Sequence, residues 1–238
     1  QIDDYDFVLT NNQRLSGPDI AEHALALTLA VARNFDHYAA QQQEGRWDRA
    51  ERRALNLDGR TMLVLGLGGI GTEIARRADA LGMRVVATRN SSRSGPDFVD
   101  YVGLADEAAE LAGSADVIVN ALPLTDTTAG SIDAPFFNAA KDGAIYVSVG
   151  RGGTTDSDAL LAALDSGKLR GAGLDVTDPE PLPVSHPLWD APHVIITPHV
   201  AANTDDARRR TLTIALENLR RYALGEPLLS VVDFERGY

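Results

Sequence analysis

From residue 61 onward, short apolar runs alternate with longer stretches in which apolar residues recur every three or four positions. The short runs are rich in β-branched residues and predict buried strands, whereas the longer stretches predict amphipathic helices. A chain that alternates in this way forms a parallel, doubly wound sheet with helices on both faces, which is an α/β fold. The predicted strands span residues 62–65, 84–88, 116–120, 144–148 and 194–197, and the predicted helices span residues 73–81, 105–112, 134–139 and 158–166.

The first sixty residues follow a different pattern. Residues 5–10 predict a short strand, and residues 21–33 predict a helix that is apolar on nearly all sides and therefore buried. Residues 41–60 are polar and rich in arginine, without a clear period, so we expect an arm that wraps over a surface. The helix and the arm offer more surface than a monomer leaves uncovered, which predicts a two-fold homodimer with Trp47 buried against the partner.

Charge and composition exclude several classes of protein. A formal net charge of −12 argues against a nucleic-acid partner, and the absence of cysteine excludes disulfides and thiolate chemistry. No apolar run is long enough to span a membrane, and residues 1–5 do not resemble a signal peptide, so we expect a cytoplasmic protein. The chain has 24 Asp, 10 Glu and only two Lys. This balance suits a halophilic organism, but a GC-rich genome with a mildly acidic surface explains it equally well.

A glycine-rich turn between the first strand of this sheet and the helix that follows matches the pattern G-x-G-x-x-G. This context is the one in which a Rossmann fold binds the pyrophosphate of a dinucleotide, through backbone N–H groups and the positive end of the helix dipole. The first glycine permits the turn, the second lets the pyrophosphate approach, and the third allows helix and strand to pack closely. We therefore predict dinucleotide contacts at Gly66, Gly68, Gly69, Ile70 and Gly71.

The end of the second strand indicates which dinucleotide binds. An NAD site places an acidic residue there for the ribose 2′-hydroxyl, but this chain has no acid between Asp79 and Asp97. Arginine and serine occupy the segment instead, and a guanidinium can pair bidentately with a 2′-phosphate. The sequence thus predicts NADP(H), and the alternative is a solvated basic loop. The predicted 2′-phosphate contacts are Arg89, Ser91, Ser92 and Arg93.

Three further loops that follow the second strand carry an arginine, a glutamate and a histidine. Arg151 and His199 each come just after a predicted strand, and Glu180 lies in a proline-rich loop. Because the carboxyl ends of parallel strands share one edge, we expect these side chains to converge. An arginine can bind the carboxylate of a 2-oxo acid, a histidine can donate a proton to its carbonyl oxygen, and a glutamate beside that histidine orients the ring and favours its protonated form. We expect no metal in this site.

Seven ordered motifs resemble those of the D-isomer-specific 2-hydroxyacid dehydrogenase family. They are Ala21-Glu22-His23, the glycine-rich turn, Leu122-Pro123-Leu124-Thr125, Gly150-Arg151-Gly152, Leu174-Asp175-Val176, Pro179-Glu180-Pro181-Leu182 and Thr197-Pro198-His199. Within the family, the chain resembles the NADP-dependent glyoxylate/hydroxypyruvate reductases and 2-ketoacid reductases. The resemblance implies that Arg151 binds substrate, that Glu180 supports His199 as acid/base, that Asp175 holds the nicotinamide carboxamide, and that Leu122 and Pro123 border the adenosine. It also implies a homodimer acting on a 2-oxo acid or D-2-hydroxy acid.

The same resemblance predicts how the chain is divided. Residues 1–18 are expected to be the remnant of a substrate-binding lobe, residues 19–203 the dinucleotide-binding domain with its dimerisation helix and arm, and residues 204–238 a C-terminal helix that returns to that lobe. About a hundred residues that precede this point in the family are absent, so we expect a fragment of a longer enzyme. In such a fragment, part of the apolar face of the final helix should be exposed.

Two other functions remain open at this point. A dinucleotide-sensing, corepressor-like interaction protein could use the same fold and site, and turnover of 2-oxo acids would distinguish it from an enzyme. A formate-type dehydrogenase is disfavoured because Glu180 stands where that branch, by resemblance, carries glutamine. The sequence does not indicate which 2-oxo acid is preferred.

Overall fold

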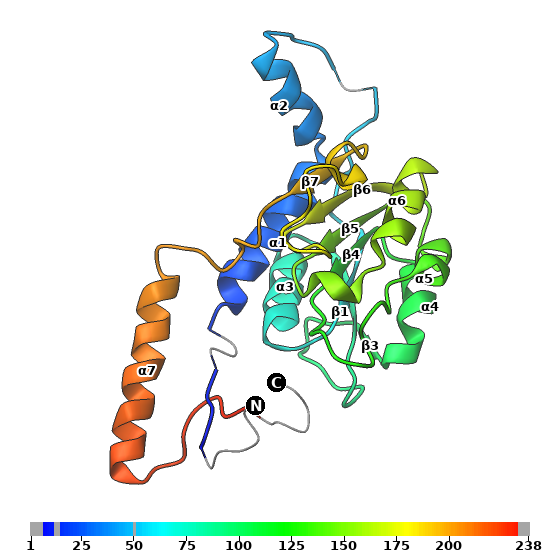
Figure 1. Cartoon of the computed structure of the whole chain (residues 1–238). Helices are drawn as coiled ribbons and strands as arrows, with labels where there is room; N and C mark the ends of the chain where they lie inside the picture. Colours follow the sequence, from blue (N-terminus) through cyan, green and yellow to red (C-terminus); the bar gives the residue numbers. More distant parts are fainter. Residues whose placement is uncertain (1–6, 12–14, 50, 233–238) are drawn as a thin grey trace.

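The computed structural model describes residues 7–11, 15–49 and 51–232 of the 238-residue chain. These residues form a seven-stranded sheet in the order β3-β2-β1-β4-β5-β6-β7, and every neighbouring pair is parallel. Figure 1 shows β3 at the bottom and β7 at the top. The order reverses between β1 and β4, the switch point where open α/β sheets bind ligands. The strands are β1 (Thr61–Leu65), β2 (Arg84–Thr88), β3 (Tyr101–Gly103), β4 (Val117–Asn120), β5 (Ala144–Ser148), β6 (Leu169–Leu174) and β7 (Val194–Ile196).

Helices cover both faces of the sheet (Figure 1). Successive side chains of a strand point to opposite faces, and the two cores show this directly. Met62 and Val64 of β1 pack toward α1 and α3, whereas Leu63 and Leu65 pack toward the helices on the other face. The predicted doubly wound parallel sheet is thereby confirmed. One face carries α1 (Gly17–Ala32) and α3 (Gly69–Ala80), and the other carries α4 (Ala108–Ala112), α5 (Ala134–Ala139) and α6 (Ser157–Asp165).

Among the described residues, two strands and one α-helix were not predicted from the sequence, namely β3, β6 and α2 (Phe35–Gln43), besides short 3-10 turns. The last three residues of α2 overlap the segment that was expected to be an irregular arm. The strand expected at residues 5–10 is not present in the described part of that segment. Residues 5 and 6 lie outside the described residues, and Thr10 forms only an isolated antiparallel bridge with Val231. The predicted boundaries of the other elements agree with the structure to within a few residues.

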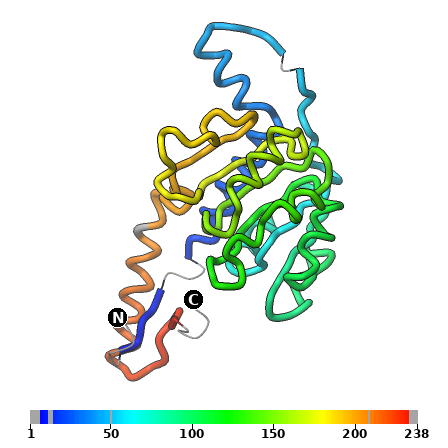
Figure 2. Tube along the Cα trace, turned by 45° about the vertical axis from the view of Figure 1, so that its right-hand side comes forward, coloured from blue at the N-terminus to red at the C-terminus, as the bar shows by residue number. Residues whose placement is uncertain are grey.

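The final helix α7 (Ala207–Leu224) stands apart from the sheet (Figures 1 and 2). Nη2 of Arg210 on α7 lies 2.5 and 2.6 Å from the two carboxylate oxygens of Asp19 in the first turn of α1, which ties the helix to the body of the protein. Its leucines Leu212, Leu216 and Leu219 are 59%, 57% and 65% exposed. The exposed apolar face expected for this helix is therefore present.

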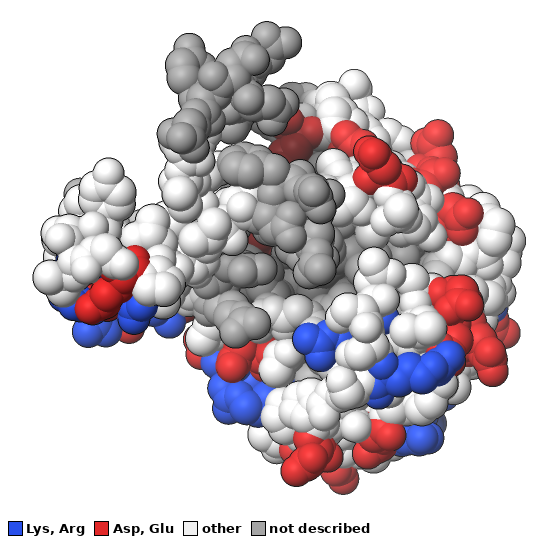
Figure 3. All heavy atoms as spheres, turned by 90° about the horizontal axis from the view of Figure 1, so that it is seen from below, with Lys and Arg blue, Asp and Glu red and all other residues white. Residues whose placement is uncertain are grey.

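The surface on the side of β3 carries charges of both signs. Viewed from below, basic and acidic side chains are interspersed over the body of the molecule and do not form one broad patch of either sign (Figure 3). The charge on this face is therefore arranged locally, in pairs and small clusters.

Among the described residues, no helix is both long and apolar enough to cross a membrane.

Candidate active site

The glycine-rich turn joins β1 to α3 at the switch point of the sheet. Gly66 has a φ of +91°, in the region that only glycine adopts readily, so it permits the turn. A Cβ on Gly71 would lie 2.1 Å from the carbonyl oxygen of Gly66, so the first turn of α3 packs directly on the loop. A Cβ on Gly68 would meet nothing within 4 Å, so the backbone there is open on its outer side. Gly69 and Ile70 begin α3, and no side chain caps its first turn. The turn has the geometry that a pyrophosphate-binding loop needs, and the predicted contacts of these residues with a dinucleotide stay a prediction.

The loop after β2 places the two predicted arginines in different surroundings. Arg89 donates only to the carbonyl oxygen of Ser94, at 3.2 Å, so among the described residues its charge has no carboxylate partner. Arg93 instead forms an ion pair with Glu107, with 2.7 Å between Nη1 and Oε1. Hydrogen bonds from Arg93, Tyr101 and the Leu104 backbone lower the pKa of Glu107 to about 2. Ser91 is exposed, and the Ser92 hydroxyl lies 2.9 Å from that of Ser94.

The segment at residues 121–123 lies between the glycine-rich turn and the loop that carries Arg151, and both pack against it. A Cβ on Gly66 would lie 3.2 Å from the carbonyl oxygen of Ala121, and a Cβ on Gly150 would lie 2.4 Å from that of Leu122. Both glycine turns therefore pack against this one segment, which holds Leu122 and Pro123. The buried side chain of Asn120 accepts from the Leu122 N–H at 3.1 Å and donates to the Tyr146 hydroxyl at 2.9 Å. Asn120 was not predicted to have a role, although it ends the strand from which this segment departs.

Arg151, Glu180 and His199 follow β5, β6 and β7, which are neighbours in the sheet. Nδ1 of His199 lies 2.6 Å from Oε1 of Glu180, with both side chains partly exposed. A Cβ on Gly152 would lie 1.9 Å from the carbonyl oxygen of Thr177, so the turn that carries Arg151 packs against the loop that leads to Glu180. The structure therefore brings the three predicted loops together at the carboxyl edge of the sheet.

The backbone of His199 has a φ of +53°, a left-handed conformation that costs a non-glycine residue free energy. The surrounding hydrogen bonds hold it there. The N–H of His199 donates to the carbonyl oxygen of Asp175 at 2.8 Å and to that of Thr197 at 3.0 Å. A strained residue of this kind persists only where its neighbours determine its position. The imidazole is therefore directed by the fold toward Glu180.

The carboxylate of Asp175 is the hydrogen-bond centre of this loop. It is 2% exposed, and it accepts from the backbone N–H groups of Val200 at 2.9 Å and Ala201 at 3.0 Å. The Thr197 hydroxyl donates to it at 2.6 Å, and Nε2 of His23 on α1 lies 2.9 Å from that hydroxyl. Sequence reasoning gave no role to His23 or Thr197, although both stand in motifs that it singled out. The predicted contact between Asp175 and a carboxamide stays a prediction.

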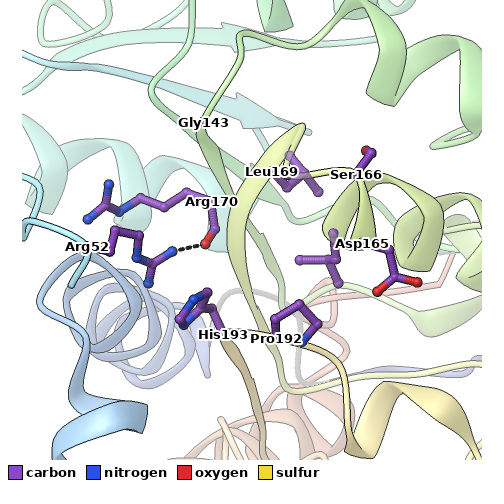
Figure 4. A pocket seen from close by; sticks show the side chains of 10 residues that line it. Arg52, Gly143, Asp165, Ser166, Leu169, Arg170, Pro192 and His193 are labelled. Atoms are coloured by element: carbon purple, nitrogen blue, oxygen red, sulfur yellow. Dashed lines mark hydrogen bonds between the residues drawn. The ribbon is translucent and has the colours of Figure 1, made fainter. Parts of the chain in front are cut away.

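A separate hollow of about 420 Å³ lies at the amino ends of β6 and β7 (Figure 4). Arg52 and His193 line one side of it, and Asp165 lines the other. Arg52 donates to the carbonyl oxygen of Arg170, which anchors the arm to the sheet. None of the predicted site residues lines this hollow, because they lie at the opposite, carboxyl edge. Among the described residues, no group of three or more metal-binding side chains is present anywhere.

A parallel sheet whose strand order reverses beside a glycine-rich turn is typical of a dinucleotide-binding domain. The sequence model described as "D-isomer specific 2-hydroxyacid dehydrogenase, NAD binding domain" matches residues 25–201. The chain therefore belongs to the D-isomer-specific 2-hydroxyacid dehydrogenase family.

Named relatives agree with this assignment. A glyoxylate/hydroxypyruvate reductase A from Klebsiella pneumoniae is 36% identical over 223 residues, which cover 93% of this chain and 70% of the relative. A D-3-phosphoglycerate dehydrogenase from Archaeoglobus fulgidus is 36% identical over 219 residues, which cover 90% of this chain and 40% of the relative. Several of the relatives are thus much longer than the segment they share with this chain.

Solved structures of the family superpose closely on the chain. A D-isomer specific 2-hydroxyacid dehydrogenase from Xanthobacter autotrophicus Py2, in complex with NADPH and MES, has a TM-score of 0.87 at 32% identity, covering 100% of this chain and 97% of that chain. An NADPH-dependent glyoxylate/hydroxypyruvate reductase from Sinorhizobium meliloti, in complex with NADP and sulfate, has a TM-score of 0.86 at 30% identity, covering 98% and 74%. The similarity extends over nearly the whole chain, including α7.

The role of Thr197 can be tested by removing its hydroxyl. The Thr197→Val substitution keeps the shape of the side chain but leaves the buried Asp175 carboxylate with one donor fewer, so the free energy of unfolding should fall by about 1–3 kcal/mol. Thr197→Ser retains the donor and should lose much less. Urea denaturation of the three proteins checks this, and equal midpoints for the parent and Thr197→Val would show that the hydroxyl does not hold the loop.

Proposed function

We propose that the protein is an oxidoreductase that interconverts a 2-oxo acid and a D-2-hydroxy acid with NADP(H). The observation that carries the proposal is the contact of 2.6 Å between His199 and Glu180, since the loop that leads to Glu180 also packs against the turn bearing Arg151. Three neighbouring strand ends supply these loops, next to the glycine-rich turn at the switch point. A carboxylate-binding cation and a proton donor beside a dinucleotide site are the groups that reduction of a 2-oxo acid requires.

Each residue of the set has a distinct role in this proposal. The bound nicotinamide supplies the hydride in reduction and accepts it in oxidation. Arg151 binds the substrate carboxylate through its fork of N–H donors. Nδ1 of His199 is engaged by Glu180, so Nε2 is the ring nitrogen that exchanges a proton with the substrate oxygen. Protonated His199 serves reduction and neutral His199 serves oxidation, so the two directions have opposite pH dependence.

NADP(H) is proposed as the dinucleotide because of the charge at the end of β2. Arg89 stands at the position where NAD sites carry an acid, and its guanidinium has no carboxylate partner among the described residues. The Xanthobacter and Sinorhizobium structures are described as complexes with NADPH and NADP. The further dinucleotide contacts proposed are Ser91, Ser92 and Arg93 at the 2′-phosphate, Leu122 and Pro123 at the adenosine, and Asp175 at the carboxamide.

We also propose a homodimer built on α1, α2 and the arm. The side chain of Trp47 is 100% exposed, and Phe35 and Tyr38 on α2 are 58% and 41% exposed. Figure 1 shows α2 and the arm projecting from the body of the molecule. Burying large aromatic side chains is strongly favourable, so this projecting segment suits a second copy of the chain.

The acid/base pair is tested by kinetics of the full-length protein on a panel of 2-oxo acids with NADPH. His199→Ala should lower kcat for reduction about 10²–10⁴-fold, the usual worth of a general acid. Glu180→Gln should lower kcat by less, because the ring keeps a hydrogen-bonding partner at Nδ1 but loses the charged one. The control is His193→Ala, which alters a histidine at the amino end of the same strand, β7, and should leave kcat close to the parental value. Near-parental kcat in His199→Ala would rule out the assignment.

Dinucleotide selection is tested by binding. Arg89→Gln should weaken binding of NADP⁺ by about tenfold or more, because the 2′-phosphate loses a charge-assisted bidentate partner, while NAD⁺ binding should change little. Calorimetric titration with both dinucleotides measures this. Arg84→Gln is the matched control, since Arg84 starts the same strand but lies at its opposite end, paired with Asp100. Equal losses for both dinucleotides in Arg89→Gln would contradict the proposal.

The dimer is tested by sedimentation. The parent should sediment as a dimer at micromolar concentration, and Trp47→Ala should dissociate at a concentration at least tenfold higher, because truncating a buried aromatic at an interface is costly. Trp189→Ala serves as the control, since Trp189 is also partly exposed but belongs to the segment between β6 and β7 rather than to α2 or the arm. A parent protein that is monomeric at micromolar concentration would refute this part of the proposal.

A further inference from the structure

Arg93 is held by a small polar cluster at the edge of the sheet. Its Nη1 lies 2.7 and 2.9 Å from the two carboxylate oxygens of Glu107 and 2.8 Å from the hydroxyl of Tyr101. The same hydroxyl donates to Oε2 of Glu107 at 2.5 Å, and the Leu104 N–H donates to Oε1 at 2.7 Å. The carboxylate is therefore fixed from three sides, by β3, by the turn that follows it and by the arginine.

The two arginines of the loop after β2 thus differ in the charge they offer to a ligand. Arg89 donates to a neutral carbonyl oxygen, so no carboxylate among the described residues balances its positive charge. The charge of Arg93 is balanced by Glu107. Tyr101 and Arg93 also border a hollow of about 400 Å³, so the arginine side chain has open space beside it into which it can turn. The Arg93 side chain is 54% exposed and that of Glu107 is 21% exposed, so the arginine end of the pair is open to solvent and its partner can be exchanged for another anion.

We propose that Glu107 sets the preference between the two dinucleotides by forming an ion pair with Arg93, which draws this arginine away from the 2′-phosphate. In this arrangement Arg89 offers the 2′-phosphate an unpaired charge, whereas Glu107 competes with that phosphate for Arg93 and so weakens the second contact. Glu107 does not touch the dinucleotide, so it acts as a positioning residue through Arg93. The inference rests on the proposed use of NADP(H). We therefore expect the parent to prefer NADP⁺ over NAD⁺ less strongly than it would if both arginines were free to bind the 2′-phosphate.

The test compares NADP⁺ and NAD⁺ binding by calorimetry at low ionic strength, where exposed charges are least screened. Glu107→Gln keeps an oxygen that can accept from the Leu104 N–H but removes the charge that holds Arg93. It should tighten NADP⁺ binding about three- to tenfold and leave NAD⁺ binding nearly unchanged. Tyr101→Phe removes one donor to Glu107 and should change the ratio of the two affinities in the same direction, by less.

Two controls separate this effect from a general change in charge or fold. Glu110→Gln makes the same charge change on α4, at a glutamate that forms no ion pair with any described residue, and should leave the ratio unchanged. In Glu107→Gln/Arg93→Gln the gain should disappear, because the released arginine is gone. The proposal is overturned if the ratio stays constant or falls in Glu107→Gln, if both dinucleotides gain equally, or if the gain survives in the double variant. The effect of Arg89→Gln tests the proposed cofactor separately.

Discussion

The buried carboxylate of Asp175 is the constraint on which the geometry of the site depends. A carboxylate can only accept hydrogen bonds, and a buried one is stable only when its acceptor positions are filled. The chain fills them with the N–H groups of Val200 and Ala201 and with the hydroxyl of Thr197, all from the turn that carries His199. Leaving this charge unpaired would cost free energy, so the turn is held in the conformation that supplies the three donors. The left-handed backbone of His199 is tolerated for the same reason.

Close packing of glycines supplies the second constraint. Gly66, Gly150 and Gly152 each lie where a side chain would meet the backbone of a neighbouring loop. The dinucleotide turn, the segment at residues 121–123, the Arg151 turn and the loop before Glu180 are consequently stacked without intervening side chains. Rigid backbone contacts of this kind hold reactive groups in place better than flexible side chains do, which is what catalysis by positioning requires.

Much of this arrangement could be predicted from the sequence because parallel sheets impose simple rules. Residues that follow parallel strands lie at one edge, and that rule alone brings the loops of Arg151, Glu180 and His199 to the same edge of the sheet. The strand β6 was missed because its sequence, Leu-Arg-Gly-Ala-Gly-Leu, resembles a turn. The structure explains its glycines, since a Cβ on Gly173 would lie 2.7 Å from the Cβ of Leu27 on α1. A contact between residues so far apart in the chain leaves no local signal.

The roles of His23, Thr197 and Glu107 were missed for a related reason. Each depends on a partner supplied by another element. Histidine, threonine and glutamate are also common in loops and at surfaces where they have no specific function, so the residue types alone did not indicate these roles. His23 lies on α1, yet its ring meets a hydroxyl just beyond β7. Glu107 lies beyond β3, yet it balances an arginine of the loop after β2. Periodicity shows which face of an element is buried, but it does not show which polar groups will meet across elements.

The order of the strands separates two tasks along one edge of the sheet. The charges proposed to choose the dinucleotide lie beyond β2 and β3, the acid/base set lies beyond β5, β6 and β7, and the glycine-rich turn lies between them. The first group is partly exposed and screened by water, so exchanging its members costs less stability than a change in the interior would. The second group rests on a buried carboxylate, where the loss of one donor is costly. Dinucleotide preference can therefore change through single surface substitutions while the catalytic geometry, held from the interior, stays as it is.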